Sequence, residues 1–311
     1  MSTPRCITID CDYLAPQLAA AYLRVQGDEA AFIETCTAKS VPALLNALAD
    51  AKMSVEQVRY IIVTHAHLDH AGGASTLLAC CPNATLLAHP RAARHLIDPS
   101  KLVASARAVY GAERFDALYG HLSPIDAARV RTLDDGATAA LGDATLSFLH
   151  TRGHANHHFV VHDPAYDAVF TGDAFGLVYP RLQREGRYAY PSTSPTDFDA
   201  AEARISIDKV VALETARACL THFGEVTDIA NVAGQLRAWI DRSEELMLEA
   251  AALPAEAAEA HIKRGLIARF AATAADVGLM FDAGDRELLA VDLDLNAQGL
   301  AWAASKRRGA A

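Results

Sequence analysis

A short polar segment constrains this chain more than any other part of its sequence. Residues 64–73 read Thr-His-Ala-His-Leu-Asp-His-Ala-Gly-Gly and directly follow the apolar run 60–63. That run is rich in β-branched residues, which predicts a buried strand with the polar segment in the loop at its C-terminal end. Side chains of metal-binding types are unusually dense in this loop, and they are His65, His67, Asp69 and His70. Such density predicts a metal site.

The order of residues in this loop favours two neighbouring ions. Because His65 and His67 alternate, their imidazole rings are expected to point the same way. Asp69 and His70 follow after the backbone has turned, so they are able to serve a second ion. Imidazole and carboxylate ligands together suit zinc, and also iron, manganese or cobalt.

Three later segments also place a metal-binding side chain after a strand-like run. They are His154 after residues 144–149, Asp173 after residues 168–170, and His222 after residues 218–220. With glycine before His154 and before Asp173, this order of motifs resembles the signature of the metallo-β-lactamase fold hydrolases. That superfamily includes glyoxalase II and lactonases.

The resemblance implies a site with two divalent ions, with Zn²⁺ favoured and iron or manganese as alternatives. The implied ligands are His65, His67 and His154 for one ion, Asp69, His70 and His222 for the other, and Asp173 as the bridge. Each of these residues follows a predicted strand, so the resemblance places the site where several strands end.

The resemblance also implies an α/β fold, a four-layer αβ/βα sandwich with the ions in a groove at one edge of two sheets. Periodicity along the chain agrees, because strand-like runs surround a helix-like stretch at 41–52 and strands return from Leu141. A helical insertion is predicted at about 91–131, and helical spacing predicts a C-terminal extension over 229–311. The expected domains are therefore a catalytic domain over 1–228, which contains the insertion, and the helical extension.

Two departures from the family pattern fall near the expected ligands. Where many relatives have Gly-His-Thr-Pro-Gly-His, this chain has Gly-His-Ala-Asn-His-His over residues 153–158. The stiff Pro-Gly turn is thus missing, although His158 stands at the position of the second histidine. An early strand that ends Asp-x-Gly in relatives here carries Glu34, a longer carboxylate. We expect Glu34 and His158 to contact the ligands rather than the ions, and such contacts tune metal affinity.

The segment after Asp173 is rich in aromatic residues, proline, serine and threonine. Loops beside a metal often select the substrate, so this segment supplies candidates for contact with a substrate carbonyl or an anionic tail. They are Tyr179, Arg181, Tyr188 and Tyr190. An equally open interpretation is that these side chains only close the loop. Lactonases of the superfamily use a tyrosine three positions after the bridging aspartate, and Gly176 at this position weakens the lactonase interpretation.

The expected function is metal-dependent hydrolysis of a small ester-like acyl compound. A hydroxide that bridges two divalent ions would exist near neutral pH, because a single zinc lowers the pKa of bound water to ~7. Asp69 and His70 are the expected catalytic residues, and Asp69 would orient the hydroxide.

Because the layout resembles glyoxalase II with its helical C-terminal extension, a thioester is favoured, and a lactone or other ester is the alternative. No Gly-x-Ser-x-Gly motif offers a serine nucleophile.

A protein of another class would fit the same ligand set. A regulatory or effector protein would keep the metal as a structural core and act through protein contacts. The C-terminal part supplies apolar residues that need a partner, among them Met280 and Trp302. That partner would be the main domain or a second subunit, so a homodimer stays open.

Composition narrows the range of partners and compartments. The formal net charge of −10 argues against a nucleic-acid ligand, and the only compact basic run is 306–308. Hydrophobic residues make up 51% of the 311 residues, enough for a large core, and charged residues interrupt every apolar stretch before it reaches membrane-spanning length. The opening residues show no apolar core of a signal peptide. We therefore expect a cytoplasmic enzyme that acts on a small acyl substrate without a membrane partner.

Overall fold

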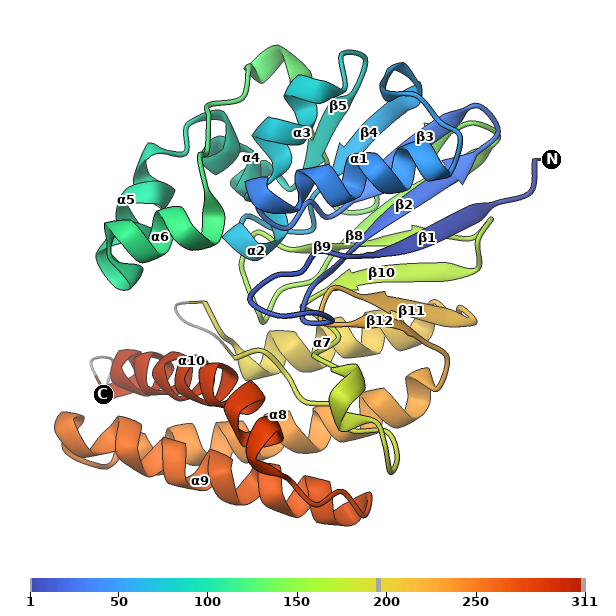
Figure 1. Cartoon of the computed structure of the whole chain (residues 1–311). Helices are drawn as coiled ribbons and strands as arrows, with labels where there is room; N and C mark the ends of the chain where they lie inside the picture. Colours follow the sequence, from blue (N-terminus) through green and yellow to red (C-terminus); the bar gives the residue numbers. More distant parts are fainter. Residues whose placement is uncertain (1, 194–196, 309–311) are drawn as a thin grey trace. The chain divides into compact units, whose positions relative to one another are not determined.

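The structure, a computed structural model, describes residues 2–193 and 197–308. Its chain forms two compact units, and each is built from segments that are far apart in the sequence (Figure 1). Of the described residues, the first unit contains 2–150, 157–172 and 215–227, and the second contains 151–156, 173–193, 197–214 and 228–308.

Two mixed β-sheets form the frame of the first unit. In the first sheet the strand order is β1 (Arg5–Asp10), β2 (Ala20–Gln26), β3 (Glu29–Ile33), β4 (Val58–Ile62), β5 (Thr85–Ala88) and β6 (Val130–Thr132). The first three strands are antiparallel neighbours, and β3 to β6 run parallel. The carboxyl ends of β3 and β4 therefore meet at the same edge of the sheet, which is the edge that carries the predicted ligand loop.

The second sheet also brings strand ends together. Its order is β12 (Gly224–Val226), β11 (Arg217–Leu220), β10 (Ala168–Gly172), β9 (Phe159–Asp163), β8 (Ala144–His150) and β7 (Thr138–Leu141). Its neighbours are antiparallel except for β10 and β11, which are parallel. The segments that follow β10 and β11 thus leave the sheet at one edge, and they carry Asp173 and His222.

The first unit also contains helices, several of which pack against the first sheet. They are α1 (Val41–Asp50), α2 (Leu68–Ala71), α3 (Ala74–Cys80), α4 (Pro90–Ile97), α5 (Ser100–Tyr110) and α6 (Ala112–Tyr119). Residues of α1, α3 and α4 lie in one core with strands of the first sheet. The buried residues of α1 are Val41, Leu44 and Leu48, at the spacing that the sequence predicts for a helix facing a sheet. Figure 1 shows α5 and α6 side by side at one end of this unit.

Neighbouring residues of β2 illustrate how the first sheet buries both faces. Leu23 lies in one core with Leu44 of α1 and Leu77 of α3. The preceding residue, Tyr22, points to the other face and packs against Phe170 of the second sheet, with ring centroids 5.2 Å apart. Because side chains alternate along a strand, one sheet separates a helix-facing core from a sheet-facing core.

The predicted helical insertion contains α4, α5 and α6, but its last part is not helical. Helix α6 ends at Tyr119, and Gly120 follows it with φ of 72°. The chain then returns to the first sheet as β6, which pairs with β5. Sequence periodicity misses β6 because its three residues include exposed Arg131 and Thr132, too few and too polar to show strand alternation.

The second unit consists mainly of helices. They are α7 (Ala200–Ala212), α8 (Ile229–Ala251), α9 (Ala255–Asp276) and α10 (Ala283–Arg308). The break between α8 and α9 falls at Pro254, because proline lacks the N–H that a helix interior needs. Helices α8, α9 and α10 pack against one another. Their core includes Trp239 and Phe270, whose ring centroids lie 4.7 Å apart.

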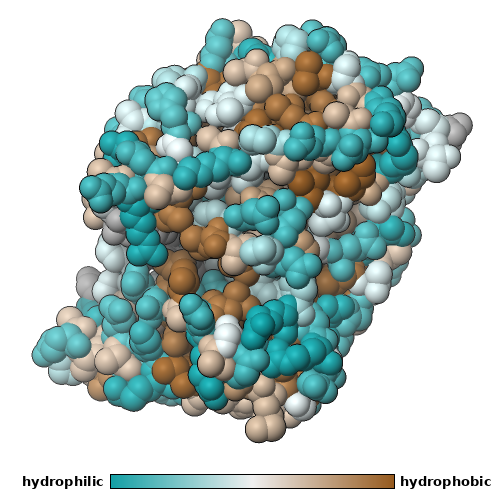
Figure 2. All heavy atoms as spheres, in the orientation of Figure 1, coloured by the Kyte–Doolittle hydropathy of each residue, from teal (hydrophilic) through white to brown (hydrophobic). Residues whose placement is uncertain are grey.

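The surface carries both hydrophilic and hydrophobic residues. On the face drawn in Figure 2, hydrophilic residues are widespread and small hydrophobic groups lie between them. Within residues 2–193 and 197–308, no helix combines the length and the apolar character needed to cross a membrane.

Candidate metal centre

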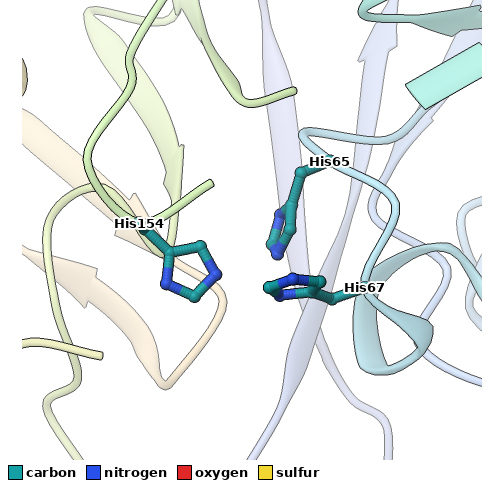
Figure 3. Close-up of side chains that lie close together, drawn as sticks. All are labelled: His65, His67 and His154. Carbon is teal, nitrogen blue, oxygen red and sulfur yellow. The ribbon is translucent and has the colours of Figure 1, made fainter. Parts of the chain in front are cut away.

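The ligand loop begins where β4 ends, and its backbone sets the direction of its side chains. His67 has an extended backbone and is the N-cap of α2. His65 and His67 project to the same side of the loop, as Figure 3 shows. The short helix α2 then turns the chain, so that Asp69 and His70 follow within one helical turn. The alternation expected from the sequence and this one unpredicted helical turn together produce a compact group of ligand types.

The imidazole rings of the loop lie in close contact. The ring centroid of His65 is 4.4 Å from that of His67 and 4.0 Å from that of His70. His65 and His70 are both 0% exposed. Buried imidazoles at such distances are typical of metal-binding loops, because a neutral imidazole can donate a lone pair to a metal.

One group of three ligand residues lies entirely within the first unit. The ligand atoms of Asp69, His70 and His222 all lie within 4.8 Å of one another. Oδ2 of Asp69 is 3.5 Å from Nε2 of His222 and 3.9 Å from Nε2 of His70. His222 follows β11, whereas the other two residues follow β4, so the two sheets supply this group together. The group has the size and the donor types of a transition-metal site.

For His65, His70 and His222, the protein holds the other ring nitrogen. Nδ1 of His70 lies 3.2 Å from Oε1 of Glu34, and Nδ1 of His222 lies 2.7 Å from the carbonyl oxygen of Leu18. Nδ1 of His65 lies 3.0 Å from the hydroxyl of Thr64. Metal-binding histidines typically have one nitrogen held in this way, which fixes the ring and directs the other nitrogen to the metal. The donor set therefore fits a metal bound through Nε2.

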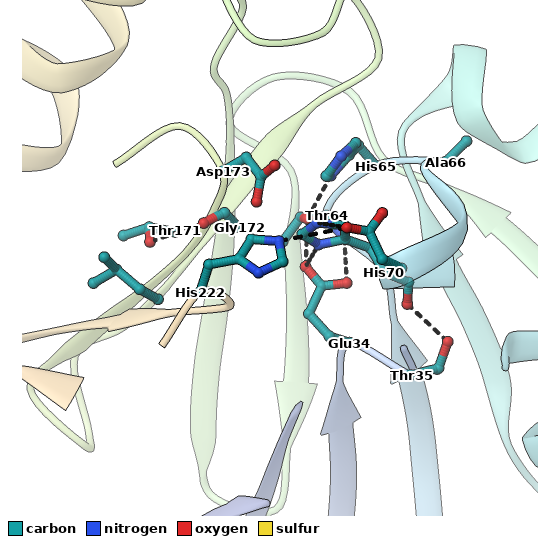
Figure 4. Close-up of polar contacts among 12 residues, drawn as sticks. Glu34, Thr35, Thr64, His65, Ala66, His70, Thr171, Gly172, Asp173 and His222 are labelled. Atoms are coloured by element: carbon teal, nitrogen blue, oxygen red, sulfur yellow. Dashed lines mark hydrogen bonds and ion pairs between the residues drawn. The ribbon is translucent and has the colours of Figure 1, made fainter. Parts of the chain in front are cut away.

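Glu34 is the centre of the contacts behind the ligand loop (Figure 4). The hydroxyl of Thr64 donates a short hydrogen bond to Oε1 of Glu34, and the same oxygen faces His70. Glu34 is 1% exposed and has a positive φ of 66°. Next to it, the amide and the hydroxyl of Thr35 both donate to the carbonyl oxygen of His70, at 2.9 and 2.8 Å. The end of β3 thus fixes both the backbone and the ring of His70.

Sequence reasoning misses two of these contacts. In the sequence, Thr64 marks only the start of the motif. Its hydroxyl stands directly before His65, and this position is the sequence signal for its contact with the His65 ring. The carbonyl of Leu18 has no sequence signal, because every residue carries such a group and only the fold brings it to His222.

The glycine before Asp173 is required by a close approach of three segments. Gly172 has a φ of 49°, and a Cβ at this position would lie 2.5 Å from the Thr64 hydroxyl and 2.5 Å from Nε2 of His158. His158 is fully buried, and its ring centroid is 4.9 Å from that of His65. The Gly-Asp pair of the motif therefore lets β10 pass directly behind the ligand loop, and His158 packs against a ligand ring.

Two further predicted ligands, His154 and Asp173, lie next to each other within the second unit. Nε2 of His154 is 3.3 Å from Oδ2 of Asp173, and Nδ1 of His154 is 3.2 Å from the carbonyl oxygen of Ser192. Both residues are buried, at 5% and 6% exposure. His154, also drawn in Figure 3, follows β8, and Asp173 follows β10. This pair has the same design as the first unit, with one nitrogen held by a carbonyl and the other beside a carboxylate.

The four predicted substrate contacts are distributed within the second unit. Tyr179, Tyr188 and Tyr190 are buried, and Nε of Arg181 donates to the buried carboxylate of Asp285 at 2.9 Å. The hydroxyl of Tyr188 donates to the carbonyl of Phe270 at 3.2 Å. The hydroxyl of Tyr190 donates to Asp292 at 2.7 Å. Burial raises the pKa of both phenols, so they remain donors. These contacts fasten the segment to α9 and α10, and a role in substrate binding stays a prediction.

Histidines beside the insertion form a separate pair. The ring centroids of His89 and His150 are 4.1 Å apart, and Nδ1 of His89 accepts the N–H of Arg91 at the start of α4. Burial lowers the pKa of His89 to about 4, and His150 adds to this effect.

Comparison with protein families gives one match that covers more than half of the chain. The family model described as the metallo-beta-lactamase superfamily matches residues 16–222. A metallo-beta-lactamase fold-containing protein of Sulfurisphaera tokodaii, ST1585, is 30% identical over 138 residues. This match covers 43% of the chain and 51% of ST1585, so the chain spans about half the length of that curated relative.

Solved structures show the same fold over longer stretches. The crystal structure of ST1585 from Sulfolobus tokodaii superposes with a TM-score of 0.65 and 20% identity, covering 96% of this chain and 98% of that chain. The family protein TTHA1429 from Thermus thermophilus gives a TM-score of 0.66 at 19% identity, covering 99% and 94%. The B3 metallo-beta-lactamase BLEG-1 gives 0.55 at 20% identity, covering 73% and 95%. The predicted fold class is confirmed, and at these identities the likeness concerns the fold alone.

Proposed function

The chain belongs to the metallo-beta-lactamase superfamily, and from this premise we propose that it hydrolyses a small ester-like acyl compound, a thioester in the first place, with the help of bound divalent metal ions. The observation that carries the proposal is the arrangement of Asp69, His70 and His222 at strand ends, with one nitrogen of each histidine held by the protein. A purely structural cluster would not need this orientation of every ring.

The proposed ligand set extends this group with the remaining motif residues. One ion would be held by His65, His67 and His154, the other by Asp69, His70 and His222, and Asp173 would contact both. The support is that every member is an imidazole or a carboxylate, the donors that zinc, iron and manganese accept. Zn²⁺ is the metal we favour, and the donor types leave iron and manganese as alternatives.

Two divalent ions supply a water molecule that is acidic enough to act as a nucleophile near neutral pH, together with Lewis-acid activation of an acyl carbonyl. The residues of the chain would then divide the remaining tasks. Asp69 has 27% of its side chain exposed, in contrast to fully buried His70, so Asp69 is the ligand best placed to accept a proton from the attacking water and to orient it. Glu34 would hold the ring of His70 through Nδ1 during turnover.

The preference for a thioester rests on layout and on one local restriction. The chain resembles glyoxalase II in carrying helices after its last ligand, here α8, α9 and α10. A lactonase-type tyrosine has no room at position 176, because a Cβ on Gly176 would lie 2.5 Å from Leu236 and 2.6 Å from the carbonyl oxygen of Tyr190. Lactones and other carboxylic esters remain the second substrate class to test.

The test is thiol release from a panel of acyl thioesters, measured with metal-loaded protein beside matched lactones and carboxylic esters. The test variant is His70→Ala, which removes one proposed ligand. The matched control is His121→Ala, which removes an exposed histidine outside the proposed ligand set. We expect rapid thiol release by the wild type and by His121→Ala, and almost none by His70→Ala.

Each other outcome has a definite meaning. Faster turnover of lactones or esters than of every thioester would contradict the thioester preference and retain the hydrolase. Equal activity of His70→Ala and wild type would contradict the metal-dependent mechanism. No hydrolysis of any substrate by fully metal-loaded protein would count against an enzyme and in favour of a metal-containing effector.

A further inference from the structure

We propose that His157 is a positioning residue for the ligand loop, and that it raises the metal affinity of the site served by His65 and His67. The proposal depends on the ligand assignment proposed above and is independent of which substrate is cleaved. His157 stands where the family pattern has glycine, within the run Gly-His-Ala-Asn-His-His at 153–158. The role is therefore a property of this chain rather than of the motif.

Two successive hydrogen bonds connect the ligand loop to the start of β9. The N–H of Phe159 donates to the carbonyl of Thr64 at 3.0 Å. Two residues along the loop, the N–H of Ala66 donates to Nδ1 of His157 at 3.4 Å. A side chain thus continues the connection where main-chain pairing stops. Ala66 is 1% exposed, so its N–H depends on a protein acceptor rather than on bulk water.

The ring of His157 also lies beside the rings of both proposed ligands that flank Ala66. It stacks on His65 with a centroid distance of 6.0 Å and an angle of 19° between the planes. It meets His67 edge to face, at 5.7 Å and 90°. On a further side it faces His95 of α4, at 6.2 Å and 62°. The imidazole of His157 therefore contacts the backbone between two proposed ligands and lies beside the rings of both.

A glycine at this position could make none of these contacts. Without His157 the N–H of Ala66 loses its acceptor, and the two ligand rings lose a neighbour that limits their rotation. Metal binding would then have to order the loop, which lowers the affinity. Replacing a residue that orients ligands typically costs 10- to 100-fold in metal affinity. Because the hydrogen bond is long at 3.4 Å, we expect the metal affinity to fall by about 10-fold, the lower end of that range.

The experiment measures stepwise Zn²⁺ affinity of full-length protein by competition with a chromogenic chelator. The variants are His157→Ala, His157→Asn and His157→Gln, with His121→Ala as the control for loss of an exposed histidine. Asparagine places Oδ1 close to the position of Nδ1 and can accept the N–H of Ala66, whereas glutamine reaches past it. Co²⁺ absorption reports the ligand geometry, and thermal unfolding of metal-free protein reports a general loss of stability.

The expected result is selective. His157→Ala weakens one of two binding steps by about 10-fold, and His157→Asn restores a large part of this loss. His157→Gln restores nothing, and His121→Ala leaves both steps unchanged. The unfolding temperature of the metal-free variants stays within about 3 °C of the wild type. Should His157→Ala fail to fold, the difference between the Asn and Gln variants carries the same test.

Three results would overturn the proposal. Unchanged affinity in His157→Ala would show that the contacts do not act on the metal. Equal weakening of both binding steps, or equal loss in the Asn and Gln variants, would show a general structural effect. A wild type that binds no Zn²⁺ would overturn the ligand assignment first, and this outcome is separate from a wild type that binds normally beside an unaffected variant.

Discussion

The ligand loop of the first unit and the aromatic segment of the second unit both follow a strand, but they use their polar side chains for different purposes. In the loop, buried His65 and His70 face each other, and their Nδ1 atoms are held from behind. In the aromatic segment, the hydroxyls of Tyr188 and Tyr190 bond to α9 and α10. Several metal-binding side chains within one loop therefore predict a site from sequence, whereas the role of scattered aromatic residues depends on which distant elements they pack against.

The largest effect that separates the two regions should be on activity. His70→Ala removes a proposed ligand, so we expect thioester turnover to fall by on the order of 10²–10³, the cost of losing one charge-stabilising group in an active site. Tyr190→Phe should change turnover by less than about 2-fold, because its hydroxyl is engaged by Asp292. Steady-state rates of both variants with saturating metal provide the measurement. A large loss of activity in Tyr190→Phe with normal folding would assign this tyrosine to the substrate.

A smaller effect should follow from the residue behind the ligands. Glu34→Gln keeps the size of the side chain but replaces the oxygen pair that receives the Thr64 hydroxyl and faces His70. We expect metal affinity to fall by about 10- to 100-fold, with turnover largely recovered at high metal concentration. Chelator competition gives the affinity, and rates at increasing Zn²⁺ give the recovery. Activity that stays low at saturating Zn²⁺ would instead give Glu34 a direct part in the reaction.

The aromatic segment should respond in stability rather than in activity. Tyr190→Phe leaves the carboxylate of Asp292 without its phenol donor in the packed helical unit. We expect the free energy of unfolding to fall by about 1.5–3 kcal/mol, the usual contribution of one hydrogen bond to a charged group. Urea unfolding of metal-free protein provides the measurement. Stability equal to the wild type would mean that Asp292 finds a replacement partner and that this bond does not fasten the segment.

The smallest effect concerns pH and the histidine pair beside the insertion. The pKa of His89 is about 4 in the folded chain, against about 6.5 for an unfolded histidine. Between these values the unfolded chain binds more protons, so stability falls as the pH falls from about 6.5 to about 4. In His89→Asn, which can still cap α4, this fall should be shallower. Urea unfolding from about pH 7.5 to about pH 4.5 measures both slopes, and identical slopes would contradict the assignment.

Much of the fold and the candidate site follows from local sequence signals. The apolar run before Thr64 predicts β4, and the spacing of Val41, Leu44 and Leu48 predicts α1. Both patterns depend on which side of one element is buried, and this is visible in a short window. The motif also marks the glycine at position 172, whereas its physical reason, the lack of space for a Cβ beside Thr64, appears only in the fold.

The features that the sequence did not predict depend on residues far apart in the chain. β6 is a strand because β5 offers it an edge, not because of its own composition. The carbonyl of Leu18 reaches His222, 204 residues away, and no pattern of residue types marks that contact. The same holds for Tyr188, which bonds to a carbonyl of α9, 82 residues away. Polar contacts of this kind are decided by the packed fold, so only the structure identifies them.

Metal-dependent thioester hydrolysis is tested most directly by a metal titration of the rate, starting from protein stripped with a chelator. We expect no thiol release by the metal-free protein and a rate that rises to a plateau as two equivalents of Zn²⁺ are added. His70→Ala should show no such rise at the same equivalents. Thiol release by the metal-free protein as fast as by the loaded protein would exclude metal-dependent hydrolysis.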